Sequence, residues 1–191
     1  SVASRGLGDV HKRQVLRKIS SSVAKIKTGL QSKIFLGDIN SKRDWGHAKD
    51  YVYMQWLMLQ QDKPEDYVIA SGEMKSVREF IELSALALQW NKDKGGQGII
   101  WEKSGVDEIG KRADTGKIVI RIESRYFRPT EVDLLLGDST KAKQELGWEP
   151  KVSLADGIKI SYISILSSKG YNPLVYLEDA KSRNIDLTEF F

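Results

Sequence analysis

The stretch VLRKISSSVAKIKTGLQSKIFLG, residues 15–37, contains a helical pattern followed directly by a strand pattern. Its apolar residues recur every three or four positions, the spacing of one face of an amphipathic helix, and Gly29 ends the pattern. The residues on this face are Val15, Ile19, Val23, Ile26 and Leu30. The segment KIFLG (33–37) then predicts a short strand that ends in a turn.

The same alternation of helices and strands continues along the chain. Helices are predicted at 47–61, 76–90, 140–146 and 154–166, and strands at 66–71, 99–102 and 117–122. In the first of these helices one face is expected to hold Ala48, Val52, Trp56 and Leu59. Ser76 and Glu79 have the spacing of a capping box, and Gly147 is a stop signal. The sequence therefore predicts an α/β fold.

Composition limits the classes of protein to consider. The 191 residues are 40% hydrophobic and 29% charged, which is ordinary for a globular protein. Cysteine is absent, so disulfides and a cysteine nucleophile are excluded, and no apolar run approaches the roughly 18 residues that span a bilayer. We expect a soluble, cytoplasmic protein that binds no membrane. The formal charge of +4 comes from basic residues scattered among acidic ones, so we expect no nucleic-acid partner.

Residues 1–14, SVASRGLGDVHKRQ, have neither a helical nor a strand period. They resemble the translation of a sequencing-library adaptor, and we expect this tail not to be native; a native loop is the alternative. Gly6-Leu7-Gly8 lacks the third glycine and the preceding strand of a dinucleotide fingerprint. The expected organisation is thus a tail at 1–14, a binding lobe at 15–167 and a weakly patterned C-terminal tail at 168–191.

No catalytic set is apparent in the sequence. His11 lies in the N-terminal tail and His47 stands alone, so neither a metal site nor a nucleophilic triad is predicted. His47 is expected near a helix N-terminus, in a structural or capping role. Trp45, Trp56 and Trp148 are expected in the core or at its rim.

Two stretches suit anion binding. In NSKRDWGHAKDYV (40–52), Arg43 precedes the predicted start of a helix, where backbone donors favour an anion. In ESRYFRPTEVD (123–133), Arg128 precedes Pro129, and the proline ring favours extended backbone that would project the guanidinium from a rigid point. The alternative is that these arginines form surface ion pairs.

Several segments together resemble the C-terminal part of the GDP-mannose 4,6-dehydratase family, within the extended short-chain dehydrogenases/reductases. The segments are RKISSSVAKI, KRDWGHAKDYV, KPEDYVIASGEMKSVREFIE and RYFRPTEVDLLLGDSTKAKQELGWEPKVSL. An Arg-Asp before a helix and an LGW-x-P near the end are shared by many sugar-nucleotide enzymes. RDWGHAKDYV combined with RYFRPTEVD is more specific to the GDP-mannose family.

The resemblance implies a lyase that uses NADP and acts in the biosynthesis of nucleotide sugars such as GDP-fucose. In that family, oxidation at C4 of the sugar acidifies C5, water leaves from C5 and C6, and hydride returns to C6, giving GDP-4-keto-6-deoxymannose. An N-terminal Rossmann lobe holds NADP and the catalytic Thr, Glu, Tyr and Lys. The resemblance therefore implies that this chain is the C-terminal nucleotide-sugar-binding lobe, with the Rossmann lobe missing, that it is inactive alone, and that the complete enzyme is a homo-oligomer.

Carried over by position, the family's substrate ligands fall on five residues of this chain. Arg43 and Arg128 match ligands of the GDP-mannose diphosphate, and Glu131 matches a carboxylate at the ribose hydroxyls. Lys18 matches a lysine near the nucleotide, and Gly37 lies in the turn beside the guanosine. Asp44 and Trp45 are expected to orient and pack the turn that follows Arg43. Two alternatives remain, namely a different sugar-nucleotide epimerase or dehydratase, and a non-catalytic nucleotide-binding domain.

Overall fold

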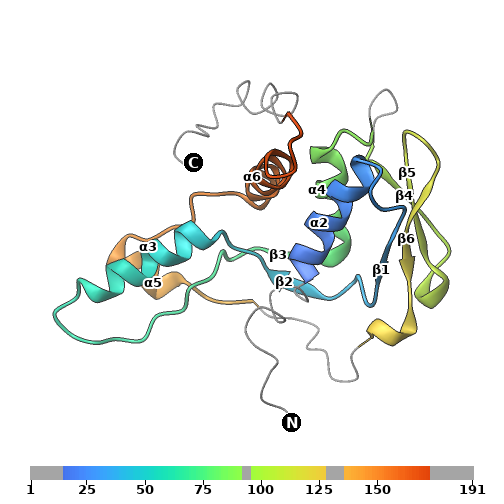
Figure 1. The fold of residues 1–191 in the computed structure, drawn as a ribbon. Helices are drawn as coiled ribbons and strands as arrows, with labels where there is room; N and C mark the ends of the chain where they lie inside the picture. Colours follow the sequence, from blue (N-terminus) through green and yellow to red (C-terminus); the bar gives the residue numbers. More distant parts are fainter. Residues whose placement is uncertain (1–14, 92–95, 128–135, 173–191) are drawn as a thin grey trace, which may run out of the picture. The chain divides into compact units, whose positions relative to one another are not determined.

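The computed structural model describes residues 15–91, 96–127 and 136–172, and these residues divide into two units (Figure 1). The first unit contains the described residues up to Gly37, from Ile81 to Phe127 and from Ile158 onward. The second contains those of Asp38–Phe80 and Arg128–Gly157. The helices α4 (Val77–Ala87) and α6 (Leu154–Ser167) cross the division in the chain.

A four-stranded mixed sheet in the order β1-β6-β5-β4 organises the first unit. Strand β1 (Ile34–Leu36) pairs in parallel with β6 (Ile118–Ile122), and β5 (Ile109–Arg112) pairs antiparallel with both β6 and β4 (Ile99–Glu102). The 3₁₀ helix η1 (Gly105–Asp107) connects β4 to β5, and η2 (Ser124–Tyr126) follows β6. The pairing of β1 with β6 places the carboxyl ends of two strands at the same edge of the sheet.

Helices of the first unit pack together through apolar side chains. Figure 1 shows α2 (Val15–Lys27) beside α4, and the Lys27 amine donates to the Leu88 carbonyl that follows α4 at 3.3 Å. Tyr162 of α6 is fully buried; burial raises the pKa of its hydroxyl, while the Ser20 and Ser84 hydroxyls act in the opposite direction. These contacts join three helices around one core.

The second unit has a smaller core around Met54, Ala142 and Trp148. Strands β2 (Lys42–Asp44) and β3 (Met74–Ser76) form a two-stranded antiparallel sheet. Helices α3 (Ala48–Leu59) and α5 (Thr140–Leu146) supply most of the apolar side chains of this core, and Trp148 follows α5 in the chain. Asp50, which is only 5% exposed, stabilises this core.

Local helix signals predicted the helices well. The capping box is present, since the Ser76 amide donates to the Glu79 carboxylate at 2.7 Å and the Glu79 amide donates to the Ser76 hydroxyl at 3.1 Å. Helix α5 has the predicted bounds, and Gly147 follows it in a left-handed conformation with φ of 62°. Helix α2 buries Ile19, Val23 and Ile26 as predicted, but it ends at Lys27, so Leu30 is exposed.

The predicted buried face of α3 is wrong. Val52, Trp56 and Leu59 are exposed, with exposed fractions of 62%, 53% and 82%, so Trp56 is not a core residue, whereas Trp148 is buried. Instead α3 buries Asp50 and Met54. Apolar residues occur around most of this helix, and its contacts with Trp148 therefore decide which face is inside.

The predicted strand at 66–71 is not a strand, and it pairs with no other strand among the described residues. Tyr67 and Ile69 pack against the small core of the second unit instead, and Ala70 lies against Gly137. Conversely, β2, β3 and β5 were not predicted, because they are short and contain Lys, Arg or Asp.

The Asp50 contacts predict a large effect of Asp50→Asn on the second unit. One carboxylate oxygen accepts the Lys151 and Val152 amides, each at 3.0 Å, and the Asp50 carbonyl accepts the Trp148 indole N–H at 3.0 Å. We expect the substitution to lower the free energy of unfolding by about 1–3 kcal/mol, because buried amide donors lose a charged acceptor. Urea unfolding followed by tryptophan fluorescence measures this change.

The matched control is Asp62→Asn, in the exposed loop after α3, which should change the free energy of unfolding by less than about 0.5 kcal/mol. Equal effects of the two substitutions would show that Asp50 does not fasten this core.

Candidate functional site

The parallel strands β1 and β6 end side by side, and the candidate site lies beyond their carboxyl ends. Gly37 follows β1, and a Cβ added to it would lie 2.4 Å from the Tyr126 carbonyl oxygen and 3.1 Å from the Phe127 amide nitrogen. The Glu123 amide, after β6, donates to the Leu36 carbonyl at 2.9 Å. Only a glycine at position 37 allows the two backbones to approach this closely. In open α/β sheets this edge is where ligands bind.

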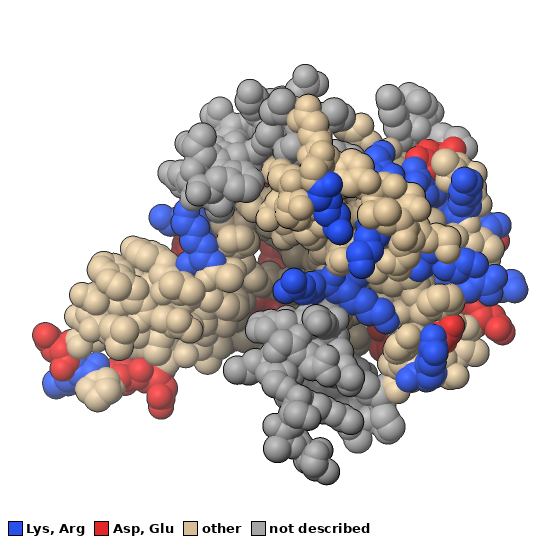
Figure 2. All heavy atoms as spheres, in the orientation of Figure 1, with Lys and Arg blue, Asp and Glu red and all other residues tan. Residues whose placement is uncertain are grey.

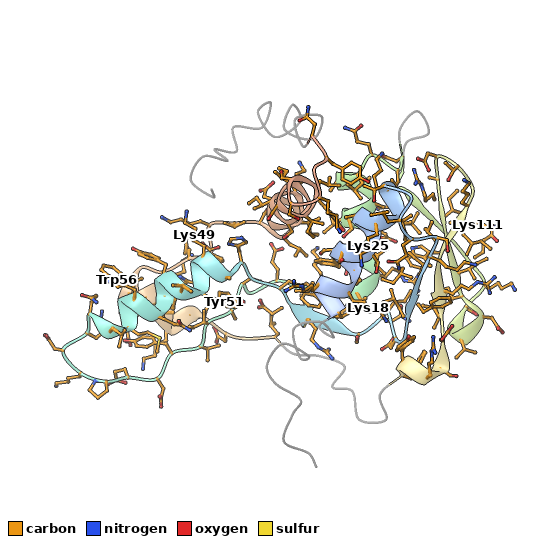
Figure 3. The ribbon with its side chains drawn as sticks, in the orientation of Figure 1. Lys18, Lys25, Lys49, Tyr51, Trp56 and Lys111 are labelled. Carbon is orange, nitrogen blue, oxygen red and sulfur yellow. The ribbon has the colours of Figure 1, made fainter. Side chains whose placement is uncertain are left out.

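Lys18 lies at the same place, brought there by α2 (Figure 3). Its amine donates to the carbonyl of Phe35 in β1 at 2.5 Å and lies 3.8 Å from the centre of the Tyr126 ring. Lys18 and Gly37, both predicted as site residues, therefore share one neighbour, Tyr126. The sequence offered only a weak signal for Tyr126, the aromatic pair enclosed by Arg125 and Arg128.

Charged groups around Lys18 set its electrostatics. Arg125 stacks near the same Tyr126 ring, 4.8 Å from its centre, and forms an ion pair with Glu123. Burial lowers the pKa of the Lys18 amine below its ordinary value of 10.5, the Arg125 charge lowers it further, and the Glu123 charge partly raises it. An anion placed beside the two cations would stabilise the charged form of Lys18.

Arg43 lies in the second unit, in β2. It pairs with Lys75 of β3, and its guanidinium donates to the Lys42 carbonyl at 2.6 Å. The next residues form the turn that leads into α3, which begins one residue after the predicted position. His47 is the N-cap, and its Nδ1 accepts the Lys49 amide at 3.3 Å, as expected for a capping residue.

Asp44 and Trp45 hold the turn after Arg43, as the sequence predicted. The Asp44 carboxylate accepts the Ser71 and Gly72 amides at 2.8 and 2.9 Å. The Trp45 indole donates to the Lys75 carbonyl at 2.8 Å, and its ring packs on Phe80. The sequence did not predict Tyr51 of α3, which interacts with Asp44. The only feature of the sequence that hints at this contact is Gly46, which leaves room for the Tyr51 ring.

The five predicted site residues thus fall into three groups. Lys18 and Gly37 come together in the first unit, and Arg43 lies in the second. Arg128 and Glu131 lie outside the described residues, directly after the η2 turn in the chain. Their binding roles stay predictions.

Other kinds of site find no support in the described part of the chain. Residues 15–91, 96–127 and 136–172 contain no cluster of three His, Asp or Glu side chains that could hold a metal. None of the helices in these ranges has the length and apolar character needed to cross a bilayer. No described helix follows a strand through a G-x-x-G-x-x-G turn, which in dinucleotide-binding folds contacts the diphosphate of the cofactor.

Solved structures show which fold this chain resembles. A structure titled RMD from Pseudomonas aeruginosa complexed with NADPH matches with a TM-score of 0.61 and 20% identity, over 83% of this chain and 43% of that chain. A dTDP-glucose 4,6-dehydratase from Bacillus anthracis matches with a TM-score of 0.54 and 21% identity, over 82% and 42%. The chain resembles in fold the matched part of sugar-nucleotide epimerases and dehydratases of the short-chain dehydrogenase/reductase type.

Sequence comparison identifies the family within this class. A family model described as GDP-mannose 4,6 dehydratase matches residues 8–161, and the chain belongs to that family. A human GDP-mannose 4,6 dehydratase is 51% identical over 76% of this chain and 37% of the human protein. One from Yersinia enterocolitica is 49% identical over 74% of this chain and 39% of that protein. The chain thus spans less than two fifths of the length of these relatives.

The cluster around Tyr126 predicts how the charge of Lys18 responds to its neighbours. We expect the Lys18 amine to titrate below 10.5, and we expect Arg125→Gln to raise its pKa and Glu123→Gln to lower it. The pKa is lower in the folded chain than in the unfolded chain, so the unfolded chain binds more protons between the two values and stability rises with pH there. Titration of the Lys18 side-chain carbon signal by NMR measures the shift.

Arg121→Gln, at an exposed position of β6, removes the same charge and is the control. If Arg125→Gln moves the Lys18 pKa no more than Arg121→Gln does, the two cations do not share the Tyr126 site.

Proposed function

We propose that this chain binds GDP-mannose as part of an NADP-dependent GDP-mannose 4,6-dehydratase, a lyase that forms GDP-4-keto-6-deoxymannose. The observation that carries the proposal is the family match over residues 8–161, which includes every predicted substrate ligand. The relatives carry the name of that activity. The substrate GDP-mannose, the reaction and the cofactor NADP are inferred for this chain from its family.

The geometry at the carboxyl ends of β1 and β6 supports a nucleotide site. Lys18 and Arg125 place cations over the Tyr126 ring, and Gly37 brings the two strand ends together. A diphosphate needs such permanently charged or strongly basic donors. By their match to the family, Arg43 and Arg128 would give the diphosphate forked donors, and Glu131 would accept hydrogen bonds from the ribose hydroxyls.

The surface of α3 supports the proposal that a Rossmann lobe precedes these residues in the complete protein. Val52, Trp56 and Leu59 form an exposed apolar stripe on α3, and the Tyr53 ring stacks on Trp56 at 5.8 Å. Figure 2 shows that the surface over α3 carries few charged side chains, which gather instead in the loop beyond it. Such a stripe is typical of a helix that covers a sheet, and the matches to this chain span less than two fifths of the length of these relatives.

We call Arg43 and Arg128, the proposed ligands of the diphosphate, the diphosphate grip. The grip predicts that Arg43→Ala and Arg128→Ala selectively lose affinity for ligands with a diphosphate. Charge-assisted contacts contribute about 1.5–3 kcal/mol each, so each substitution should weaken binding of GDP by roughly 10- to 150-fold. Binding of guanosine, which has no phosphate, should change little. Calorimetric titration with GDP, guanosine and UDP separates the diphosphate grip from recognition of the base.

Arg17→Ala, at an exposed position of α2, is the matched control, and His47→Asn should also have a small effect. If both Arg43→Ala and Arg128→Ala bind GDP as tightly as the parent, these arginines form surface ion pairs and the grip is wrong.

The chain alone should not dehydrate GDP-mannose. The family's catalytic Thr, Glu, Tyr and Lys belong to the N-terminal lobe, and the described residues lack the glycine-rich turn that would hold NADP. Assay of the purified chain for the 4-keto product, with NADP present, should give only background. Product at a rate that scales with the amount of chain would contradict this placement of the catalytic groups.

A further inference from the structure

We infer that Asp44 and Tyr51 are a positioning pair for Arg43, with Gly46 supplying the space that lets the pair form. The inference rests on the proposed function and deepens it, because it names what fixes the backbone that carries Arg43, one of the two arginines of the diphosphate grip. All of these residues belong to the second unit.

Asp44 fastens the loop that precedes β3. One carboxylate oxygen accepts the Ser71 amide at 2.8 Å, and the other accepts the Gly72 amide at 2.9 Å. Asp44 also pairs with Met74 in the two-stranded sheet. The carboxylate therefore ties the end of β2, one residue after Arg43, to both the loop and the strand beside it.

Tyr51 completes the pair from the first turn of α3. Its hydroxyl hydrogen-bonds to the Asp44 carboxylate; burial chiefly raises the pKa of this hydroxyl, and the Asp44 charge and hydrogen bond raise it further. The phenol therefore remains a hydrogen-bond donor at neutral pH. On its other side the Tyr51 ring lies 6.4 Å from the ring of Trp148, centre to centre, which holds it against the core of the unit.

Gly46 makes this arrangement possible. A Cβ added to Gly46 would lie 2.2 Å from atoms of the Tyr51 ring, including its hydroxyl oxygen. Any side chain at this position would therefore displace Tyr51 from Asp44. Because glycine is conformationally flexible, the contacts of Asp44 and Tyr51 are what restrain this turn between Arg43 and the start of α3.

The pair affects Arg43 in two ways. It fixes the backbone on which the guanidinium stands, together with the Trp45 contact to Lys75, so less conformational freedom is lost when an anion binds. In addition, the Asp44 carboxylate accepts hydrogen bonds from three donors, namely the Tyr51 hydroxyl and the Ser71 and Gly72 amides. A carboxylate without these donors, adjacent in the chain, could pair with Arg43 and compete with a bound diphosphate.

A double-mutant cycle tests the inference. Tyr51→Phe keeps the ring and removes only the hydroxyl, and we expect it to weaken GDP binding about 2- to 10-fold, the range of one hydrogen bond, while guanosine binding stays the same. If Tyr51 acts through Arg43, this loss should disappear when Tyr51→Phe is made in an Arg43→Ala background. A general loss of structure would instead lower guanosine binding too and would persist in that background.

Tyr53→Phe, an exposed tyrosine on the same helix, is the matched control and should leave GDP affinity unchanged. Gly46→Ala should reproduce the loss seen with Tyr51→Phe. The inference is overturned if Tyr51→Phe binds GDP like Tyr53→Phe, or if its effect is the same with and without Arg43.

A measurement without ligand keeps the inference testable should the parent chain fail to bind GDP, an outcome that would reject the proposed function. Hydrogen exchange at the Ser71 and Gly72 amides, and NMR relaxation of the Arg43 side-chain N–H, report the positioning directly. We expect faster exchange and greater Arg43 mobility in Tyr51→Phe than in Tyr53→Phe. Equal values in the two variants would overturn the inference whatever the result with GDP.

Discussion

The parallel pairing of β1 with β6 is the contact on which the candidate site depends. A parallel pair requires a long crossover between its strands, and here the chain between them supplies α3, α4 and the rest of the sheet. The pairing brings Gly37 against the backbone of Tyr126. It thereby positions the Tyr126 ring, which both Lys18 and Arg125 contact. A side chain at position 37 would separate the two strand ends, and the cations would then lose their common neighbour.

Signals carried by neighbouring residues made the helices predictable. The Ser76–Glu79 capping box and the left-handed Gly147 act within one turn of the helix that they begin or end, so their effect can be derived from the sequence alone. The strands β1, β4 and β6 were predictable from runs of isoleucine, valine and other apolar residues. In both cases the information lies within a few residues of the element.

The remaining features depend on partners that are distant in the chain. Strands β2 and β3 contain lysine and aspartate and exist because they pair with each other, and the inner face of α3 is selected by Trp148 and by amides of residues 151 and 152. The candidate site follows the same rule. Lys18, Gly37 and Arg43 were predicted from resemblance to a family, whereas Tyr126 and Tyr51 become meaningful only once the fold places them against Lys18 and Asp44.

The same dependence explains why the segment 66–71 has the composition of a strand without being one here. Its sequence, DYVIAS, favours a buried strand, but a strand requires an edge with which to exchange hydrogen bonds. Among the described residues that edge is missing, and the exposed stripe of Val52, Trp56 and Leu59 on α3 lacks a cover in the same unit. Under the proposed function one partner meets both needs, because the sheet of a Rossmann lobe can accept a further strand at its edge and a helix on its face. Under that proposal, both features would follow from the contact with a single partner surface, and neither would be a defect of local folding.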